Sequence, residues 1–264
     1  MSSPEHIAVQ FMQARRAGRA LTAYPGEVPA DLGAAYRSQE VEIDNWNDRL
    51  LGWKVARIGP QWQSKYPEER LIGPVFARNM HVAAPDEVVA CPVFADGFAA
   101  VEAEIGVYVR ADAPAGKTDW TTQSAADQVA QMCIGVEVAS SPLATLNDLG
   151  PGAVISDFGN NWGVIAGALV DDWQSLRQDL EVETFIDDQS VGRATIAIPD
   201  TPLSALAFAL NKAAQRGRPL RKGDYISTGM ITGVHDIRIG QRSRLTFGRY
   251  GEIRCRMIRA DALA

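Results

Sequence analysis

The chain has 264 residues, of which 46% are hydrophobic and 22% charged, as in an ordinary globular protein that can bury a full core. The formal net charge of −6 leaves no broad basic field for a nucleic-acid backbone, so we expect no nucleic-acid partner. Three scattered cysteines without a CxxC pair favour neither a disulfide framework nor a cysteine zinc site, and a reducing cytoplasm fits best. Because no run approaches the ~18 apolar residues of a membrane span and the N-terminus does not resemble a signal peptide, no membrane association is expected.

The first 80 residues are predicted to be mainly helical. Ser3 is a suitable N-cap, Pro4 suits the first helical position, and apolar residues follow at helical spacing. After a break that contains Pro and Gly, a second helix is predicted with Asp31 as its cap. The sequence GWKVARIG, residues 52–59, then predicts a short strand between glycines.

From about residue 81 onward the chain is predicted to be rich in strands. Alternation of apolar residues and continuous apolar runs are typical of half-buried and fully buried strands, respectively. The patterns predict strands at 98–110, 132–140 and 161–170, hairpins that turn at Asp187–Ser190 and Gly248–Gly251, and an amphipathic helix that ends near Gly217. Strands joined by hairpins, with few helices between them, favour an α+β fold with a rolled, largely antiparallel β-core over a regular doubly wound sheet.

Three glutamates stand out within these apolar segments. Glu102 and Glu104 lie two residues apart in one strand, so both side chains project from the same face. Glu137 occupies a similar position in the next predicted strand. Such a pattern usually marks the solvated face of an antiparallel sheet. If the three carboxylates instead converge, their hard oxygen ligands suit Mg²⁺ or Mn²⁺.

Two further features are weak when taken alone. Lys54 in the strand 52–59 has the ordinary interpretation of a surface lysine, but near a metal and an anion it could bind a carboxylate or move a proton. Residues 222–234, KGDYISTGMITGV, predict a turn, a short strand and a loop whose Thr228 hydroxyl and Gly229 backbone could meet an anion. Motifs for nucleotides, zinc proteases and serine hydrolases (GxGxxG, GxxxxGK[ST], HExxH and GxSxG) are absent from the sequence.

Taken together, four motifs point to one family. GWKV, VEAEIGVYV, GVEVASS and GDYISTG occur here in the order and at roughly the spacing seen in the fumarylacetoacetate hydrolase superfamily. Over essentially its whole length the chain resembles the hydratase/decarboxylase branch, which is typified by 2-keto-4-pentenoate hydratase. The resemblance implies a mixed β-sandwich roll with a mainly helical N-terminal portion at 1–80 and a β-rich catalytic domain at 81–264, which together form one functional unit.

The resemblance also implies a site and a reaction. It implies that a divalent ion, Mg²⁺ or Mn²⁺, is bound by Glu102, Glu104 and Glu137, that Lys54 and Glu102 are catalytic, and that Lys54, Asp157, Thr228 and Gly229 contact the substrate. The implied reaction adds water to a 2-hydroxy-2,4-dienoate and gives a 4-hydroxy-2-oxo acid, in the catabolism of aromatic compounds. The resemblance further implies a cytoplasmic homo-oligomer whose partner is this small 2-oxo or 2-hydroxydienoic acid.

The sequence departs from the family pattern around the expected substrate. The strand continues as KVARIGP with Arg57, ARNM places Arg78 and Asn79 where the family carries acidic residues, and SDFGNNWG places Asn160 and Asn161 where the family has small residues. These changes leave three alternatives beside hydration. They are decarboxylation of a 4-oxalocrotonate-like acid, C–C hydrolysis of an acylpyruvate, and a non-catalytic role in binding a metal and a keto acid.

Overall fold

The computed structural model describes residues 3–176 and 178–262. Its helices are α1 (Pro4–Ala17), α2 (Leu32–Asn45), α3 (Thr122–Ala125), α4 (Pro151–Ile155) and α5 (Asp200–Gln215). Its strands are β1 (Leu50–Arg57), β2 (Arg70–Phe76), β3 (Met80–Val82), β4 (Val88–Val93), β5 (Phe98–Val109), β6 (Val129–Ser141), β7 (Asn161–Leu169), β8 (Leu180–Ile186), β9 (Gln189–Ile196), β10 (Tyr225–Ser227), β11 (His235–Asp236), β12 (Arg242–Thr246) and β13 (Glu252–Arg259).

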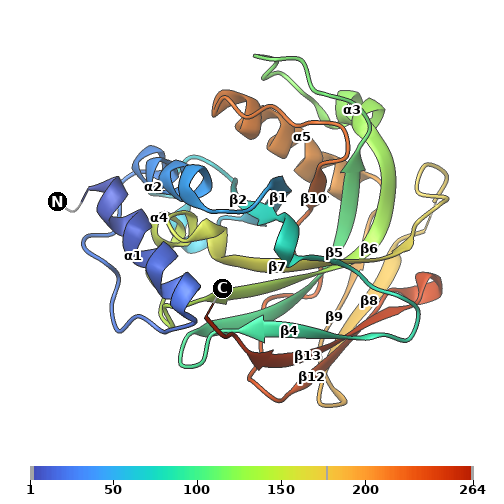
Figure 1. Ribbon diagram of the computed structural model, residues 1–264. Coiled ribbons are helices and arrows are strands. Elements are labelled where there is room, and N and C mark those ends of the chain that lie inside the picture. Colours follow the sequence, from blue (N-terminus) through green and yellow to red (C-terminus); the bar gives the residue numbers. More distant parts are fainter. Residues whose placement is uncertain (1–2, 177, 263–264) are drawn as a thin grey trace.

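Within the described residues the strands form two curled sheets (Figure 1). The larger sheet has the order β2-β1-β10-β5-β6-β7-β3, with β11 paired to β5, and the smaller has the order β4-β13-β12-β8-β9. Most neighbours are antiparallel, whereas β1–β10, β3–β7 and β4–β13 are parallel. Helices α1, α2 and α4 gather at one end of the larger sheet, and α5 lies over it (Figure 1). The predicted α+β roll with a largely antiparallel β-core is therefore confirmed.

Local sequence signals account for the ends of these elements. The Ser3 side chain accepts a hydrogen bond from the backbone N–H of His6 at 3.2 Å, and Asp31 accepts one from Ala34 at 2.7 Å, so both predicted N-caps are confirmed. The hairpin of β8 and β9 turns through Asp187 with φ 46°, a left-handed conformation that Asp tolerates better than most residues.

The predicted division near residue 80 crosses the larger sheet. Strands β1 and β2 precede it, yet both belong to this sheet, and β1 pairs with β10 of the β-rich remainder. Parallel pairing of β1 with β10 places Lys54 opposite Ser227 and Gly52 opposite Tyr225. Gly52 has φ 152°, and a Cβ there would lie 1.9 Å from the carbonyl oxygen of Tyr225. Only glycine therefore permits this close approach of the two strands.

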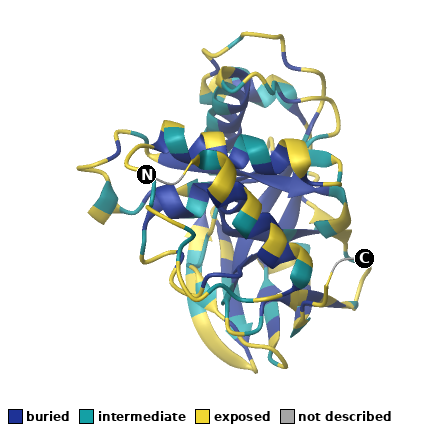
Figure 2. Cartoon of the chain, turned by 60° about the vertical axis from the view of Figure 1, so that its left-hand side comes forward, coloured by how far each residue is buried: buried dark blue, intermediate teal, exposed yellow. Residues whose placement is uncertain are grey.

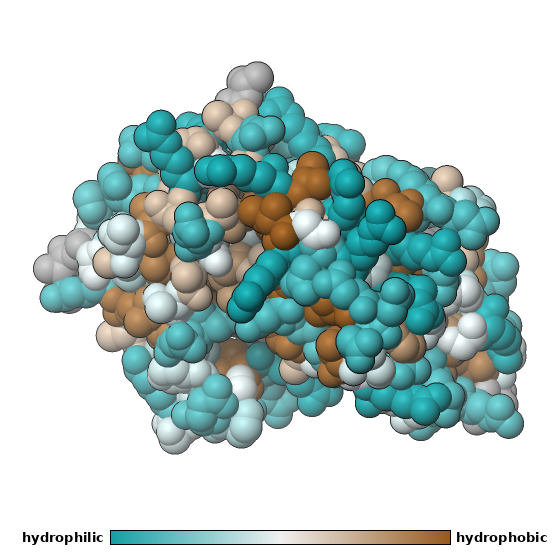
Figure 3. Space-filling view, turned by 90° about the horizontal axis from the view of Figure 1, so that it is seen from below, coloured by the Kyte–Doolittle hydropathy of each residue, from teal (hydrophilic) through white to brown (hydrophobic). Residues whose placement is uncertain are grey.

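Burial places the core between the two sheets and beneath the helices. Figure 2 shows the long central strands buried and the helices exposed on their outer faces. The face in Figure 3 is mainly hydrophilic, with its apolar side chains in small separate groups. Among the helices of the described residues, none is long and apolar enough to cross a membrane.

Candidate active site

The three glutamates converge inside the larger sheet. Strands β5 and β6 pair so that Glu102 lies directly opposite Glu137, while Glu104 lies opposite Gly135. One carboxylate oxygen from each glutamate lies within 4.8 Å of those of the other two. Glu104 and Glu137 are 0% exposed and Glu102 is 6% exposed, so the solvated-face interpretation is wrong.

Neighbouring polar groups leave much of this cluster unpaired. The Ser227 hydroxyl donates to Glu104 Oε2, and Lys54 Nζ forms an ion pair with Glu137 Oε1 at 3.1 Å. Within the described residues, Glu104 Oε1 and Glu137 Oε2 have no hydrogen-bond donor, and Glu137 Oε1 has only the ion pair with Lys54. When all four groups are ionised, three carboxylates and one ammonium leave a formal charge of −2. Unpaired hard oxygens with this net charge fit a divalent cation such as Mg²⁺ or Mn²⁺.

Burial and mutual repulsion alter the titration of these groups. Burial, followed by the charge of Glu137, raises the pKa of Glu102 to about 8. The pKa of Glu104 is well above its usual value, first through burial and then through repulsion by Glu137 and Glu102. Burial lowers the pKa of Lys54, but the three carboxylates, Glu137 foremost, outweigh that effect and the net pKa is raised. Lys54 is therefore a charged ammonium near neutral pH.

These shifts predict how pH affects the metal-free protein. Because the pKa of Glu102 is higher in the folded state than the ordinary 4.5, the folded chain holds more protons than the unfolded chain between about pH 4.5 and 8. The free energy of unfolding should therefore fall as pH rises through this window. Thermal melts in EDTA from pH 5 to 8.5 would measure this slope. Glu102→Gln should flatten it, and an unchanged slope in that variant would contradict the assignment.

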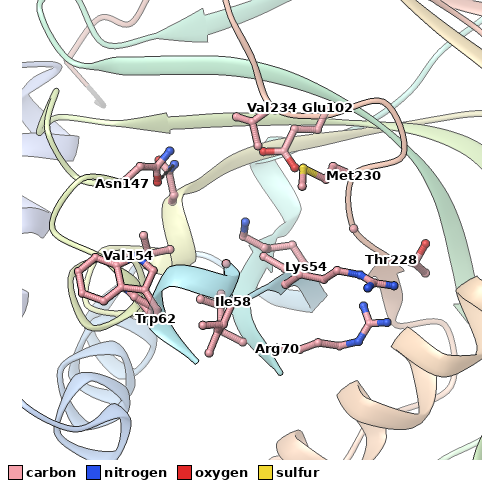
Figure 4. A pocket seen from close by; sticks show the side chains of 18 of the residues that line it. Lys54, Ile58, Trp62, Arg70, Glu102, Asn147, Val154, Thr228, Met230 and Val234 are labelled. Atoms are coloured by element: carbon pink, nitrogen blue, oxygen red, sulfur yellow. Dashed lines mark hydrogen bonds between the residues drawn. The ribbon is translucent and has the colours of Figure 1, made fainter. Parts of the chain in front are cut away.

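A cavity of about 280 Å³ opens beside the cluster. Glu102 and Lys54 approach it from opposite walls (Figure 4), while Glu104 and Glu137 lie outside its lining. Thr228 and Gly229, both from the GDYISTG turn, also line it. The cavity therefore brings together four of the residues implied by the family resemblance.

The Thr228 hydroxyl already has a partner. It donates to the backbone carbonyl of Ile105 at 2.7 Å, so it would have to rotate before it could donate to a bound carboxylate. On the same side of the cavity as Thr228, Figure 4 shows the side chain of Arg70. Asn160, from the altered SDFGNNWG segment, lines another wall, and its Nδ2 donates to Asn147 Oδ1 at 3.2 Å.

Comparisons with known proteins identify the fold. No family model and no curated protein matches the chain. Among solved structures, 4-oxalocrotonate decarboxylase from Pseudomonas putida G7, complexed with magnesium and adipate, is 20% identical with a TM-score of 0.79, over 97% of each chain. Fumarylpyruvate hydrolase from Pseudomonas aeruginosa, complexed with Mn²⁺ and pyruvate, is 15% identical with a TM-score of 0.55, over 81% of this chain and 91% of that one.

A third structure, 2-hydroxyhepta-2,4-diene-1,7-dioate isomerase from Mycobacterium marinum, is 17% identical with a TM-score of 0.51, over 80% of this chain and 77% of the other. The chain has the fold of the fumarylacetoacetate hydrolase superfamily. The helical end formed by α1 and α2 is included in the match to the decarboxylase, which covers nearly the whole of both chains.

In this fumarylacetoacetate hydrolase fold, Asp157 is placed differently from the sequence-based expectation. Its carboxylate forms an ion pair with Arg15 of α1, both residues are 0% exposed, and Asp157 is not among the residues that line the cavity. Arg15 also donates to the carbonyl oxygens of Ser140 at 3.1 Å and Asn161 at 3.2 Å. The structure therefore favours a structural role for Asp157 over the substrate contact implied by the resemblance.

Three other altered positions, Arg78, Asn79 and Asn161, do not line this cavity. Arg78 lies at a different cavity, and Asn79 donates to the backbone carbonyl of Trp162. Asn161 donates to the carbonyl oxygen of Pro74 at 3.0 Å, which ties β7 to β2. Sequence reasoning did not select Ser227 or Arg15, although Ser227 lies within the recognised GDYISTG motif.

Proposed function

We propose that this chain is a divalent-metal-dependent enzyme that acts on a 2-oxo or 2-hydroxydienoic acid. The observation that carries the proposal is the buried cluster of Glu102, Glu104 and Glu137, which has unpaired oxygens and lies beside a charged lysine at a small cavity. Three carboxylates buried together repel one another, and a bound cation would offset this cost. Similarity to structures that contain Mg²⁺ or Mn²⁺ and small organic acids agrees with this choice.

Different residues of the chain would bind the metal, bind the substrate and transfer protons. A divalent ion held by Glu102, Glu104 and Glu137 would supply Lewis acidity, stabilising negative charge that develops on the C2 oxygen of the acid. Lys54 would hold the adjacent substrate carboxylate or carry a proton, since its ammonium reaches the cavity. The backbone and hydroxyl groups of Thr228 and Gly229 would orient the same carboxylate.

Hydration is the first candidate reaction. Protonation of the dienol at C5, with loss of the C2 hydroxyl proton, gives a conjugated 2-oxo-3-enoate. Water then forms a bond to C4, C3 gains a proton, and the product is a 4-hydroxy-2-oxo acid. Lys54 and Glu102, which line the cavity, are the groups best placed to move these protons. The homo-oligomeric assembly and the place in aromatic catabolism remain predictions from the family resemblance.

Decarboxylation is the second candidate, and the near-complete structural match to 4-oxalocrotonate decarboxylase favours it. In a 2-oxo-3-enedioate, the bond between C5 and the distal carboxylate breaks and carbon dioxide leaves. The released electron pair passes through the conjugated chain to the C2 oxygen, which gains a proton to give a 2-hydroxydienoate. Both candidates use the same stabilisation at the C2 oxygen, so the cluster itself supports them equally.

One assay tests both candidates. Purified protein with Mg²⁺ is supplied with freshly made 2-hydroxypenta-2,4-dienoate or with 4-oxalocrotonate, and diene absorbance, carbon dioxide and products are followed. Hydration predicts loss of diene absorbance with a 4-hydroxy-2-oxo product, and decarboxylation predicts carbon dioxide release. Lys54→Met should lower either rate by about 10²–10⁴-fold. Bound Mn²⁺ and pyruvate without turnover of any dienoate or acylpyruvate would instead indicate a binding protein.

A further inference from the structure

Two arginines face each other at the cavity. Arg57 at the end of β1 and Arg70 at the start of β2 are direct cross-strand partners, and both line the cavity. Like charges directly opposite each other in an antiparallel pair are destabilising. The charge of Arg57, after the larger effect of burial, lowers the pKa of Arg70. The fold thus places two positive charges that repel each other at the wall of the cavity.

Neither guanidinium has a counter-charge of its own. Within the described residues, no hydrogen bond or ion pair involves the side chain of Arg57 or Arg70, although Glu69 exerts a weaker favourable charge effect on Arg70. Arg70 is nevertheless only 8% exposed. Burying a guanidinium without a partner is costly, so the arrangement calls for an anion from outside the chain.

Other buried arginines in this protein are treated differently. Arg15 pairs with Asp157, and Arg216 donates from Nε to Glu40 Oε1 at 2.8 Å. Because both carboxylates belong to the chain itself, Arg15 and Arg216 stabilise the fold and need no ligand. Arg70 is comparably buried but opens onto the cavity that also contains Glu102 and Lys54 (Figure 4). A ligand in this cavity could therefore supply the anion that Arg70 lacks.

Arg70 and Glu102, the one glutamate of the cluster that lines this cavity, lie at different walls of it (Figure 4). Lys54 and Arg57 are three residues apart on β1, which corresponds to roughly 10 Å along an extended strand. A single carboxylate cannot span that distance, but the two ends of a short dicarboxylic acid can do so with the help of the long side chains. Planar guanidinium groups are also the side chains best suited to bidentate carboxylate binding.

We propose that Arg57 and Arg70 form a second anion subsite, which selects a dicarboxylic 2-oxo acid over a monocarboxylic one. The inference rests on the proposed function, since the first carboxylate and the 2-oxo group occupy the end with Glu102 and Lys54. A ligand that lacks the distal carboxylate leaves the buried Arg70 and the exposed Arg57 unpaired, and a site with an unpaired buried polar group rejects such a ligand strongly.

Binding of two matched probes tests the subsite. Isothermal titration calorimetry on the Mn²⁺-loaded protein compares 2-oxoadipate with 2-oxohexanoate, which has the same chain length but no distal carboxylate. We expect at least ~30-fold tighter binding of 2-oxoadipate, since a charge-assisted pair in a buried site is worth ~2 kcal/mol or more. Arg70→Met should remove most of this preference and leave binding of 2-oxohexanoate within about twofold. Arg57→Met should act in the same direction.

Arg37→Met is the matched control. Arg37 is exposed on α2 and does not line the cavity, so this substitution removes one positive charge at a site away from the ligand. It should keep the preference of the unmodified protein, and thermal melts should show that all variants are folded. Equal binding of the two probes, or equal weakening of both by Arg70→Met, would overturn the subsite while leaving the metal-end site intact. Failure of both probes to bind would overturn the subsite and the proposed function together. A preference that depends on the arginines would uphold the subsite even if neither 2-hydroxypenta-2,4-dienoate nor 4-oxalocrotonate is turned over.

Discussion

Glu104→Gln is expected to abolish tight binding of Mn²⁺ and Mg²⁺ while the protein remains folded. The substitution keeps the size of the side chain and an oxygen for the Ser227 hydroxyl, but it removes one of three converging charges. Loss of an outer partner of a metal ligand typically costs roughly 10–100-fold in affinity, so loss of a ligand charge should cost more than ~100-fold. Calorimetry with Mn²⁺ measures this loss.

The same variant should show a second effect of opposite sign. Glu104 is buried beside Glu137 and Glu102, and repulsion among the three raises its pKa. Removing this charge should raise the melting temperature of the metal-free protein at pH 8, while the stabilisation by added Mn²⁺ disappears. Glu27→Gln, which changes an exposed carboxylate, should alter neither quantity. Unchanged Mn²⁺ affinity in Glu104→Gln would rule out the metal site.

Arg15→Met is expected to destabilise the fold by ~3–5 kcal/mol, because it leaves a buried carboxylate without its partner. Asp157 loses its ion pair, and Glu42, whose pKa is already raised by burial and by Asp157, loses the nearby positive charge that opposes this shift. The Arg15 guanidinium also lies 4.8 Å from the ring centroid of Phe158. Urea unfolding at pH 7 measures the loss.

Two companion variants make this result specific. Arg16→Met, one position along α1, removes an exposed arginine that donates to the carbonyl oxygen of Asn45 at 2.7 Å, and it should cost ~1 kcal/mol or less. Adding Asp157→Asn to Arg15→Met should recover part of the loss, since the unpaired charge is then gone. If the double variant is as unstable as the two losses added together, the ion pair does not account for the effect.

Much of the architecture was predictable because it depends on local patterns. Ser3 and Asp31 act as N-caps through their own side chains, and the alternation in β5 fixes which residues share a face. The placement of Glu102 and Glu104 on one face follows directly from this alternation. Burial of that face could not be read from it, because both faces of β5 are covered by distant parts of the chain.

What escaped prediction depends on contacts between distant segments. The parallel pairing of β1 with β10 brings Lys54 next to Ser227, and no local pattern encodes that pairing. The family resemblance implied a substrate contact for Asp157, yet its partner is Arg15, which lies more than a hundred residues earlier. The facing arginines were equally hidden, because Arg70 is distant from every recognised motif until β2 pairs with β1.

The short strand β10 determines which segments of the chain must be present before the site can form. It lies between β1 and β5 in the larger sheet, so the backbone pairing that joins β1 to the strand of Glu102 and Glu104 runs through a three-residue insert that comes more than a hundred residues after β5. Until that insert is in place, Lys54 is separated from the carboxylates. A truncated chain that stops before Tyr225 would therefore carry all three glutamates and still lack the strand that places Lys54 and Ser227 beside them, so it should bind the metal more weakly than a chain that includes β10.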